Sequence, residues 1–519
     1  MIQRLVRLNF RGVYLILILT LTWGYCWRQL ASQDLYNNAA IGGWVWAHKQ
    51  LPRETLFLWT AHQPWIAHSW LGDLCFYAVM ANGGIVGNTL ALLLTTMLCW
   101  AVLLLLWNEW ERHGGTTILM PIAFGLALQC SGPRLEPRAD RFSDLCLAII
   151  LVLLLRRGER NREERHLRDI LVFVPLFAVW ANLHGGVALG MVLVVLTAAC
   201  EWAQDKGSPR ARGTALLAVL CLLVTAANPY GFALWSVFTE GHNAVISKIT
   251  EWKPFWEYPK LPVYAVVESF VLLAIAAVAI WRNRERRWSH IVWLLFLGAS
   301  FLEARRQIWP LSIVCLAILA VNAEAILPDR LLSMWLGSKR GPEPRKGKSK
   351  KPMRPIPPAP TLPIDALRLA ARAAVVGCLG FLIYSHHSSL DSWNPISPKL
   401  PEELINKIDL LNPPGKMFND YAVSNFLEYH YGDSRPLFID AINAYPASVT
   451  YEYSNIYAAT RVGRKLLDDK GIDYVVLSDR DPNGDPIPLA NYLAKSSNWI
   501  EEYSGYDGSL WIRLDQKTN

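Results

Sequence analysis

Eleven apolar runs divide this chain, and they constrain its fold more than any other feature of the sequence. The runs fall near residues 12–30, 84–107, 115–131, 141–155, 169–183, 187–203, 214–228, 263–281, 289–303, 307–326 and 366–385. A helix needs about 20 residues to cross the hydrocarbon of a bilayer, so the shorter runs must extend into more polar residues. The pattern predicts a polytopic α-helical membrane protein with about eleven transmembrane helices.

The composition agrees with a membrane protein. Of the 519 residues, 52% are hydrophobic and 18% are charged, whereas soluble domains carry about 25% charged residues. The 23 tryptophans favour membrane–water interfaces. The net charge of +8 comes from basic residues in short loops, with no basic groove containing interleaved aromatic residues, so we expect no nucleic-acid partner. The nine cysteines include no CxxC pair, so neither a disulfide framework nor a zinc site is predicted.

The basic loops predict the orientation, because cytoplasmic loops carry an excess of Lys and Arg. Basic residues cluster near 4–11, 156–168, 206–212, 282–287 and 339–354. All these clusters fall on the cytoplasmic side if the segment at 68–81 lies along the outer surface as an interfacial helix. If that segment does cross, another run must fail to cross. The preferred threading places the N-terminus in the cytoplasm and the chain after residue 386 outside.

This threading divides the chain into regions. Residues 1–326 are the predicted transmembrane domain, with an outer loop at 31–83. Residues 327–365 are rich in Pro, Gly and Lys and are predicted to form a basic, disordered cytoplasmic linker before a last transmembrane helix at 366–385. Residues 386–519 are predicted to form a small extracytoplasmic α/β domain.

The α/β prediction rests on short apolar runs that alternate with helical patterns. The expected strands are RPLFIDA, IDYVVLSD and GSLWIRLD, which begin at residues 435, 472 and 508. The expected helices are PEELINKIDLL and IPLANYLAKSS, which begin at residues 401 and 487.

The unusual polar motifs all fall on the predicted outer side. They are Asp34 with His48, and the segments at 60–73, 132–144, 180–186, 228–231, 249–256 and 303–310. Ionisable residues at membrane depth are costly and often mark a substrate site, so we predict an external active site at the lipid boundary. The alternative is structural: Asp34 as an interface marker, the histidines as interfacial or capping residues, and Asn182 with His184 at a helix end.

Four arginines lie outside although the charge rule favours the cytoplasm. They are Arg134, Arg138, Arg305 and Arg306. Arginine matches phosphate oxygens with several donors, so a lipid phosphate or pyrophosphate is a fitting partner. The alternative is salt bridging to Glu136, Asp140 and Glu303.

These motifs resemble the GT-C superfamily of membrane glycosyltransferases, in particular a bacterial, largely uncharacterised branch of it. The resemblance rests on QDLYNNAAIGGWVWAHKQLP at 33–52, PWIAHSWLGDLCFYAVMANGG at 64–84, WANLHGG at 180–186, NPYG at 228–231 and EW at 251–252. It continues in the tail with FNDYAVSNFLEYH at 418–430, PLFIDA, YEY and IDYVVL. Two departures stand out: Asn37 or Asn38 replaces an expected His, and Gln33 precedes Asp34 where a second acid would complete a pair.

The resemblance implies transfer of a sugar from a polyprenyl-phosphate donor to an acceptor glycan, lipid or protein at the outer face of a bacterial inner membrane. Asp34 would be the general base, and Asp140 would assist in acceptor or metal binding. The donor phosphate would bind Arg138, His184, Arg305 and Arg306. The other candidate substrate-binding residues are His48, His68, Trp70, Asn182, Glu251 and Trp252. A divalent cation, Mg²⁺ or Mn²⁺, is possible, although the first loop has no DxD pair to hold it.

Two other classes of function stay open at this point. One is a non-catalytic membrane scaffold that keeps the fold and uses the tail to bind a partner. The other is a flippase or exporter of a lipid-linked saccharide, although no intramembrane acidic relay or inverted repeat is visible in the sequence.

Overall fold

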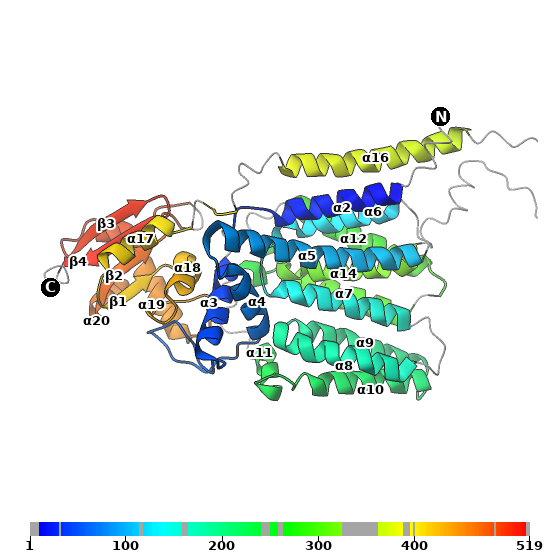
Figure 1. The fold of residues 1–519 in the computed structure, drawn as a ribbon, viewed down its shortest axis with the longest axis horizontal. Helices are drawn as coiled ribbons and strands as arrows, with labels where there is room; N and C mark the ends of the chain where they lie inside the picture. The colour runs from blue at the N-terminus through cyan, green and yellow to red at the C-terminus, as the bar shows by residue number, and fades with distance from the viewer. Residues whose placement is uncertain are drawn as a thin grey trace, which may run out of the picture.

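A computed structural model describes residues 10–30, 33–113, 118–157, 165–239, 250–257, 263–285, 287–323, 362–387, 395–397, 400–481 and 484–514. Each of the eleven apolar runs coincides with a helix, and these helices lie side by side in one bundle (Figure 1). They are α2 (Phe10–Cys26), α5 (Gly84–Arg112), α6 (Leu119–Ser131), α7 (Asp140–Arg157), α8 (Arg165–Leu183), α9 (Val187–Gln204), α10 (Pro209–Val224), α12 (Val263–Arg282), α13 (Trp288–Glu303), α14 (Ile308–Asn322) and α16 (Leu362–His387). Most of the predicted linker at 327–365 lies outside the described residues.

Helix α14 forms the centre of the bundle. Its sequence, IWPLSIVCLAILAVN, carries no charged residue and is apolar on every face, as expected for a helix surrounded by protein. It packs against α5, α6, α7, α12 and α13, and almost all of its side chains are buried. The core around it is filled by large aromatic side chains, including Trp110, Trp180, Trp293 and Trp309.

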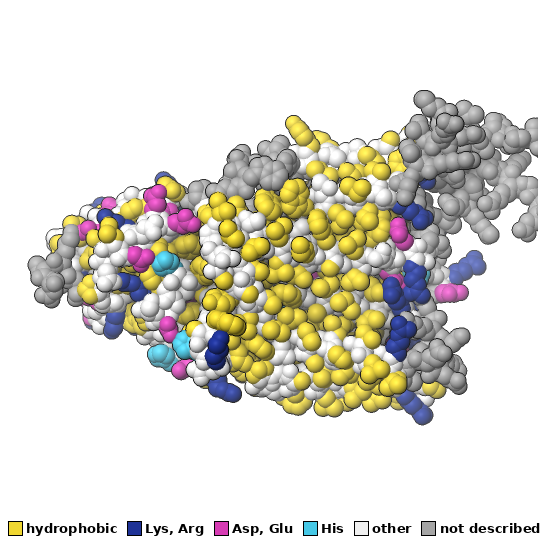
Figure 2. Space-filling model, viewed as in Figure 1, with side chains coloured by type: hydrophobic (Ala, Val, Ile, Leu, Met, Phe, Trp, Pro, Cys, Tyr) yellow, Lys and Arg dark blue, Asp and Glu magenta, His cyan; other side chains and the backbone are white. Residues whose placement is uncertain are grey.

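The apolar surface of the bundle is that of a membrane protein. Figure 2 shows hydrophobic side chains over the length of the bundle, and Lys and Arg gathered at the end away from the sheet. Within the described residues, α5, α9 and α12 are long and apolar enough to cross a membrane by length and composition alone. The count of eleven spans stays a prediction.

Two helices of the segment predicted as an outer loop lie across the other end of the bundle. These are α3 (Gln33–His48) and α4 (Trp70–Met80), which run across the axes of the long helices (Figure 1). The orientation of α4 agrees with an interfacial position for residues 68–81. The two helices touch closely at Gly42, where an added Cβ would lie 2.2 Å from the Asp73 carbonyl oxygen. Only glycine fits at that crossing.

Beyond α3 and α4 lies a four-stranded mixed sheet in the order β1-β2-β4-β3 (Figure 1). The strands are β1 (Lys416–Asn419), β2 (Ile472–Leu477), β3 (Trp499–Gly505) and β4 (Gly508–Arg513). β1 and β2 are parallel, and the other neighbours are antiparallel. The accompanying helices are α17 (Glu402–Leu411), α18 (Tyr421–Tyr431), α19 (Ala447–Tyr457), α20 (Arg461–Asp469) and α21 (Pro488–Leu493).

The predicted strand at 435–441 is wrong. Pro436 has no N–H to donate, and the backbone groups of Phe438 and Ile439 bond to the side chain of Asn419 instead of to a neighbouring strand. Leu437 instead forms a parallel bridge with Leu58 of the outer loop. The segment therefore joins the sheet region to the outer loop. The predicted strands at 472 and 508 and the helices after 401 and 487 are found, whereas β1 and β3 were not predicted.

Short 3-10 turns and one short helix complete the end of the bundle near α3. They are η1 (Gly132–Arg134), η2 (Gly231–Trp235), α11 (Ser236–Thr239), η4 (Thr250–Trp252), η5 (Phe255–Glu257) and η6 (Arg305–Gln307). Three of them, η1, η4 and η6, bring charged side chains to the bundle end.

Candidate active site

A cluster of charged residues lies where these turns meet the first turn of α3. Glu251 is its hub. Arg138 donates to both Glu251 carboxylate oxygens, each at 3.1 Å, and Arg134 is bonded to the same carboxylate. Arg306 lies 4.0 Å from it. Burial opposes ionisation of Glu251, but the three guanidinium groups together hold the pKa of its carboxyl well below its usual range.

Asp34 is the carboxylate of the cluster that solvent reaches most easily. Its side chain is 43% exposed, against 25% for Glu251 and 16% for Asp140. Arg138 Nη2 lies 2.5 Å from Asp34 Oδ2. Surrounding protein raises the pKa of Asp34, and Arg138 opposes that shift. A carboxylate with a raised pKa that an incoming hydroxyl can reach has the properties of a general base.

Asp140 is tied more tightly to arginines. Arg134 Nη2 lies 3.4 Å from Asp140 Oδ2, and Arg141 Nη2 lies 3.0 Å from Oδ1. Arg141 in turn pairs with Asp144 at 2.8 Å, one turn further along α7. Both carboxylate oxygens of Asp140 are therefore bonded to arginines. This geometry favours a role for Asp140 in positioning Arg134 and Arg141.

Arg306 is the cation of this cluster with the weakest acidic partner. Its guanidinium carbon lies 4.2 Å from the ring centroid of Trp252, and the nearest Glu251 oxygen is 4.0 Å away. Burial lowers the pKa of Arg306, and Glu251 only partly offsets that effect. A buried cation with incomplete compensation favours binding of an anion.

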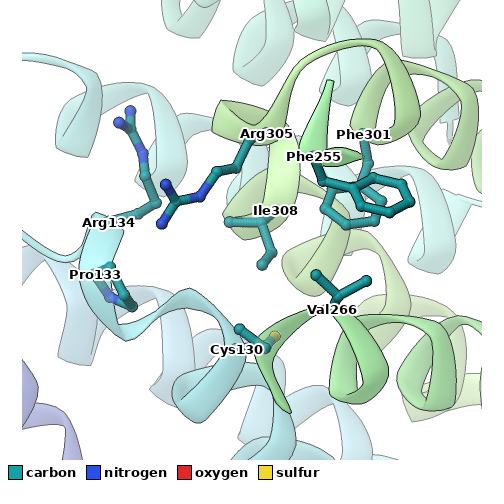
Figure 3. A pocket seen from close by; sticks show the side chains of 9 residues that line it. Cys130, Pro133, Arg134, Phe255, Val266, Phe301, Arg305 and Ile308 are labelled. Carbon is teal, nitrogen blue, oxygen red and sulfur yellow. The ribbon is translucent and has the colours of Figure 1, made fainter. Parts of the chain in front are cut away.

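The Arg305 side chain lies at a pocket next to the charged cluster. It lines a small pocket with Arg134 on one side, and the apolar side chains of Phe255, Phe301 and Val266 lie on the other (Figure 3). The Arg305 guanidinium extends toward this pocket, whereas that of Arg134 points away from it and pairs with Glu251 and Asp140 (Figure 3).

The two histidines of the cluster are uncharged at neutral pH. His184 Nδ1 accepts from the backbone N–H of Gly186 at 2.9 Å, and Ser143 Oγ lies 2.9 Å from the same atom. Nδ1 is thus an acceptor, and the proton sits on Nε2. Burial lowers the pKa of His184 to about 3 and that of neighbouring His68 to about 4. His184 is available as a neutral N–H donor, not as a cation.

Trp70 and Asn182 join neighbouring elements. Trp70 Nε1 donates to Asn182 Oδ1 at 3.0 Å. The Asn182 amide nitrogen donates to the carbonyl oxygens of Ala178 and Ala227. Both ends of the amide are therefore occupied by protein, which connects α4 to α8 and to the turn after α10.

His48 is not brought to this cluster. It lies in the last turn of α3, stacked on Trp44 with centroids 4.2 Å apart, and 3.6 Å from Asp433. Fourteen residues of helix separate it from Asp34, which corresponds to about 21 Å at 1.5 Å per residue. The sequence places the two residues in one segment, but an unbroken helix holds them apart.

Asn38 and Asp73 are site-supporting residues to which the sequence assigned no role, although Asn38 is one of two residues at the place of an expected His and Asp73 ends the polar segment at 60–73. Asn38 Nδ2 donates to Asp73 Oδ1 at 2.7 Å, and Ser69 Oγ donates to Oδ2 at 2.9 Å. Asn38 Oδ1 accepts from the backbone N–H of Ala139 at 3.3 Å, between Arg138 and Asp140. The amide thus connects α3 to the arginine loop. Its only sequence signal is the polar pair Asn37-Asn38 one turn after Asp34.

Asp73→Asn is expected to fold and to lose part of the pH dependence of stability. Asp73 is fully buried, and desolvation raises its pKa to about 8, against about 4 in an unfolded chain. The folded state therefore holds an extra proton between pH 4 and 8, and the free energy of unfolding falls with rising pH by at most about 1.4 kcal/mol per unit. Thermal unfolding of both proteins across this range measures the difference.

Asp73→Ala is the matched comparison. It leaves the Asn38 amide without its carboxyl partner and should cost about 1–3 kcal/mol near pH 4, where Asp73 is protonated in the folded wild type. The difference from the wild type should shrink as the pH rises, because Asp73→Ala also lacks the titrating group. Parallel pH profiles for Asp73→Asn and the wild type would show that Asp73 does not carry the extra proton.

The described residues contain no group of three or more His, Cys, Asp or Glu side chains arranged to hold a metal ion. Asp34, Asp140 and Glu251, the acidic candidates, each bind an arginine. This arrangement does not fit a cation site, so we derive no step through a metal, and Mg²⁺ or Mn²⁺ stays a prediction.

No protein-family model and no curated protein matches this chain. Solved structures do match its fold. The archaeal oligosaccharyltransferase AglB from Archaeoglobus fulgidus, in complex with an inhibitory peptide and a dolichol-phosphate, aligns with a TM-score of 0.58 at 10% identity, over 91% of this chain and 70% of its own. ArnT from Cupriavidus metallidurans, bound to undecaprenyl phosphate, aligns with a TM-score of 0.53 at 15% identity, over 97% of both chains.

The arabinofuranosyltransferase AftD from Mycobacteria aligns over 97% of this chain and 42% of its own, with a TM-score of 0.55 at 14% identity. These neighbours are GT-C glycosyltransferases. The chain therefore has the GT-C fold, and the resemblance seen in its sequence motifs is confirmed at the level of the fold.

Proposed function

We propose that this protein is a membrane glycosyltransferase that moves a sugar from a polyprenyl-phosphate donor to an acceptor hydroxyl at the outer membrane face. The observation that carries the proposal is the juxtaposition of accessible Asp34 with Arg138 and the incompletely compensated Arg306. A base and an anion site within one cluster are the two requirements of the reaction. The dolichol-phosphate and undecaprenyl phosphate bound to two fold neighbours support a lipid-phosphate donor.

The donor phosphate would bind on the arginine side of the cluster. Arg306 offers the most available charge, and Arg138 would exchange one of its carboxylate bonds for a phosphate oxygen. His184 would add a neutral Nε2–H donor. Arg305 would approach the same phosphate from the adjoining pocket (Figure 3).

The chemistry is a displacement at the anomeric carbon of the sugar. The acceptor oxygen forms a bond to that carbon while the bond between the carbon and the phosphate oxygen breaks. Asp34 takes the proton of the acceptor hydroxyl, and the polyprenyl phosphate leaves with the bonding electron pair. The arginines stabilise the negative charge that the leaving phosphate gains. Asp140 and Glu251 hold these arginines in place before substrate arrives.

We propose a bacterial inner membrane as its location, with the site and the sheet region outside and the N-terminus in the cytoplasm. The gathering of Lys and Arg at the bundle end away from the sheet supports this orientation (Figure 2). In this proposed orientation, the charged cluster would lie at the opposite, outer end of the bundle, together with α3 and α4.

The test is an assay of the purified protein in lipid nanodiscs with a panel of undecaprenyl-phosphate sugars. At least one donor should be consumed, with free undecaprenyl phosphate as a product, and protein-free nanodiscs provide the blank. Consumption of no donor would contradict the proposal and favour a scaffold. Movement of intact lipid-linked saccharide across the membrane without loss of its sugar would favour a flippase.

A further inference from the structure

Helices α3 and α18 pack together across the boundary between the membrane bundle and the sheet region. Asn37 Nδ2 donates to Glu428 Oε2 at 2.6 Å. Further along both segments, His48 lies 3.6 Å from Asp433. Asn37 precedes His48 in the chain, and Glu428 precedes Asp433. The two segments therefore run in the same direction, with the first turn of α18 toward the first turn of α3.

That shared direction brings the first turn of α18 to the end of α3 that carries the active-site cluster. Tyr421 is the first residue of α18, and Asp34 lies in the first turn of α3. Burial is the main cause that raises the pKa of Tyr421 to about 12, and the charges of Asp34, Glu428 and Asp440 act in the same direction. The phenol therefore keeps its proton throughout the neutral range.

A directed chain of hydrogen bonds sets the orientation of this phenol. The Tyr445 hydroxyl donates to Asn443 Oδ1 at 3.0 Å, and Asn443 Nδ2 donates to the Tyr421 hydroxyl oxygen at 3.1 Å. Across the described part of the chain, no acceptor takes the Tyr421 proton. The phenol thus retains one unused donor next to Asp34.

Asn443 is fixed in place to complete this chain. Its φ angle is +60°, in the left-handed region that asparagine tolerates better than most side-chain-bearing residues. Its backbone N–H donates to Asp440 Oδ1 at 3.2 Å, and its amide nitrogen also donates to the Ala441 carbonyl oxygen at 2.7 Å. These bonds hold the amide in one orientation toward Tyr421.

We infer that Tyr421 determines acceptor specificity by donating a hydrogen bond to a neutral saccharide whose attacking hydroxyl is held by Asp34. This inference rests on the proposed function and deepens it. The arginines lie on the donor side of Asp34, whereas its α18 side presents a phenol and an amide. Neutral polar groups of this kind match vicinal sugar hydroxyls. A carboxylate-bearing acceptor would be repelled by Asp34 and would find no cation on this face within the described residues.

The experiment measures two fates of the sugar on each undecaprenyl-phosphate donor that the wild type consumes: release to water and transfer to an added acceptor. The acceptors are methyl hexosides as neutral saccharides and methyl glucuronide as an anionic one. Tyr421→Phe should reduce transfer to methyl hexosides at least 10-fold, mainly through a raised KM for the acceptor, and leave release to water within twofold. Asn443→Gly should reproduce this result, because glycine accepts the φ angle and removes the amide that orients the Tyr421 hydroxyl.

Tyr451→Phe is the matched control, since this tyrosine of α19 is 61% exposed, and it should change neither rate. Equal loss of both rates in Tyr421→Phe, or no loss of either, would overturn the inference and leave the proposed function standing. Preferred transfer to methyl glucuronide, or no transfer to any saccharide while release to water proceeds, would also overturn it. Loss of sugar from no donor in the wild type would overturn the proposed function and this inference together.

Discussion

Asp34→Asn is expected to lower sugar transfer by about 10²–10⁴-fold, the usual contribution of a positioned general base. The amide cannot take the acceptor proton. The cluster should stay folded, because Arg138 keeps both of its bonds to Glu251. Undecaprenyl phosphate should bind at least as tightly as in the wild type, since Arg138 loses one competing carboxylate. Single-turnover transfer and binding of undecaprenyl phosphate, measured on the same nanodisc preparation, test both statements.

The wild-type pH profile adds an independent check of this role. The base must be ionised to act, and its pKa lies above the ordinary value of about 4. Activity should therefore fall as the pH drops through a value above 4. Asp433→Asn is the control, because it removes an exposed carboxylate beside the other end of α3 and should leave the rate unchanged. A rate for Asp34→Asn within twofold of the wild type would exclude Asp34 as the base.

Arg138→Ala is expected to weaken binding of undecaprenyl phosphate and to lower transfer by about 10²–10³-fold, as for the loss of one preorganised donor to a developing anion. Arg138 is also the counterion of Asp34 at 2.5 Å, so its loss should raise the pKa of Asp34 further. The acid limb of the pH profile should then move to higher pH. A purely structural role for Arg138 would not produce this shift.

Arg138→Lys separates charge from geometry. Lysine keeps the positive charge but cannot form the two parallel bonds to Glu251, so it should restore the pH profile more fully than the rate. Arg156→Ala is the matched control, because Arg156 pairs with Glu109, which keeps Arg112. Unchanged undecaprenyl phosphate affinity in Arg138→Ala, with only a lower melting temperature, would contradict the assignment.

Hydrophobic patterning predicted the helices because it is a local property. Each apolar run pairs its own backbone groups as a helix whatever its neighbours are, so all eleven runs appear as helices where the sequence indicates. The strands IDYVVL and GSLWIR were predicted for the same reason. Charge asymmetry was also informative, since Arg138 and Arg306 are basic residues in segments that the threading assigns to the side where few are expected, and both lie in the cluster with Asp34.

Contacts between distant segments determined how the residues of the candidate site are arranged. The sequence named Glu251, but only packing shows that it joins arginines 113 residues earlier and 55 residues later in the chain. The contacts of Asn38 with Asp73 and of Asn37 with Glu428 likewise depend on how α3 meets α4 and α18. Periodicity cannot report which helix faces which, because that choice depends on side-chain fit over the whole core.

The sequence by itself therefore determined the helices, the membrane character of the bundle and most of the charged residues of the candidate site. The tertiary structure decided that Asp34 pairs with Arg138, that His48 lies at the far end of α3, and that Asn37 of α3 bonds to Glu428 of α18. The physical reason is that helix formation depends on neighbours a few residues apart. A catalytic cluster depends instead on close packing between segments that hundreds of residues separate.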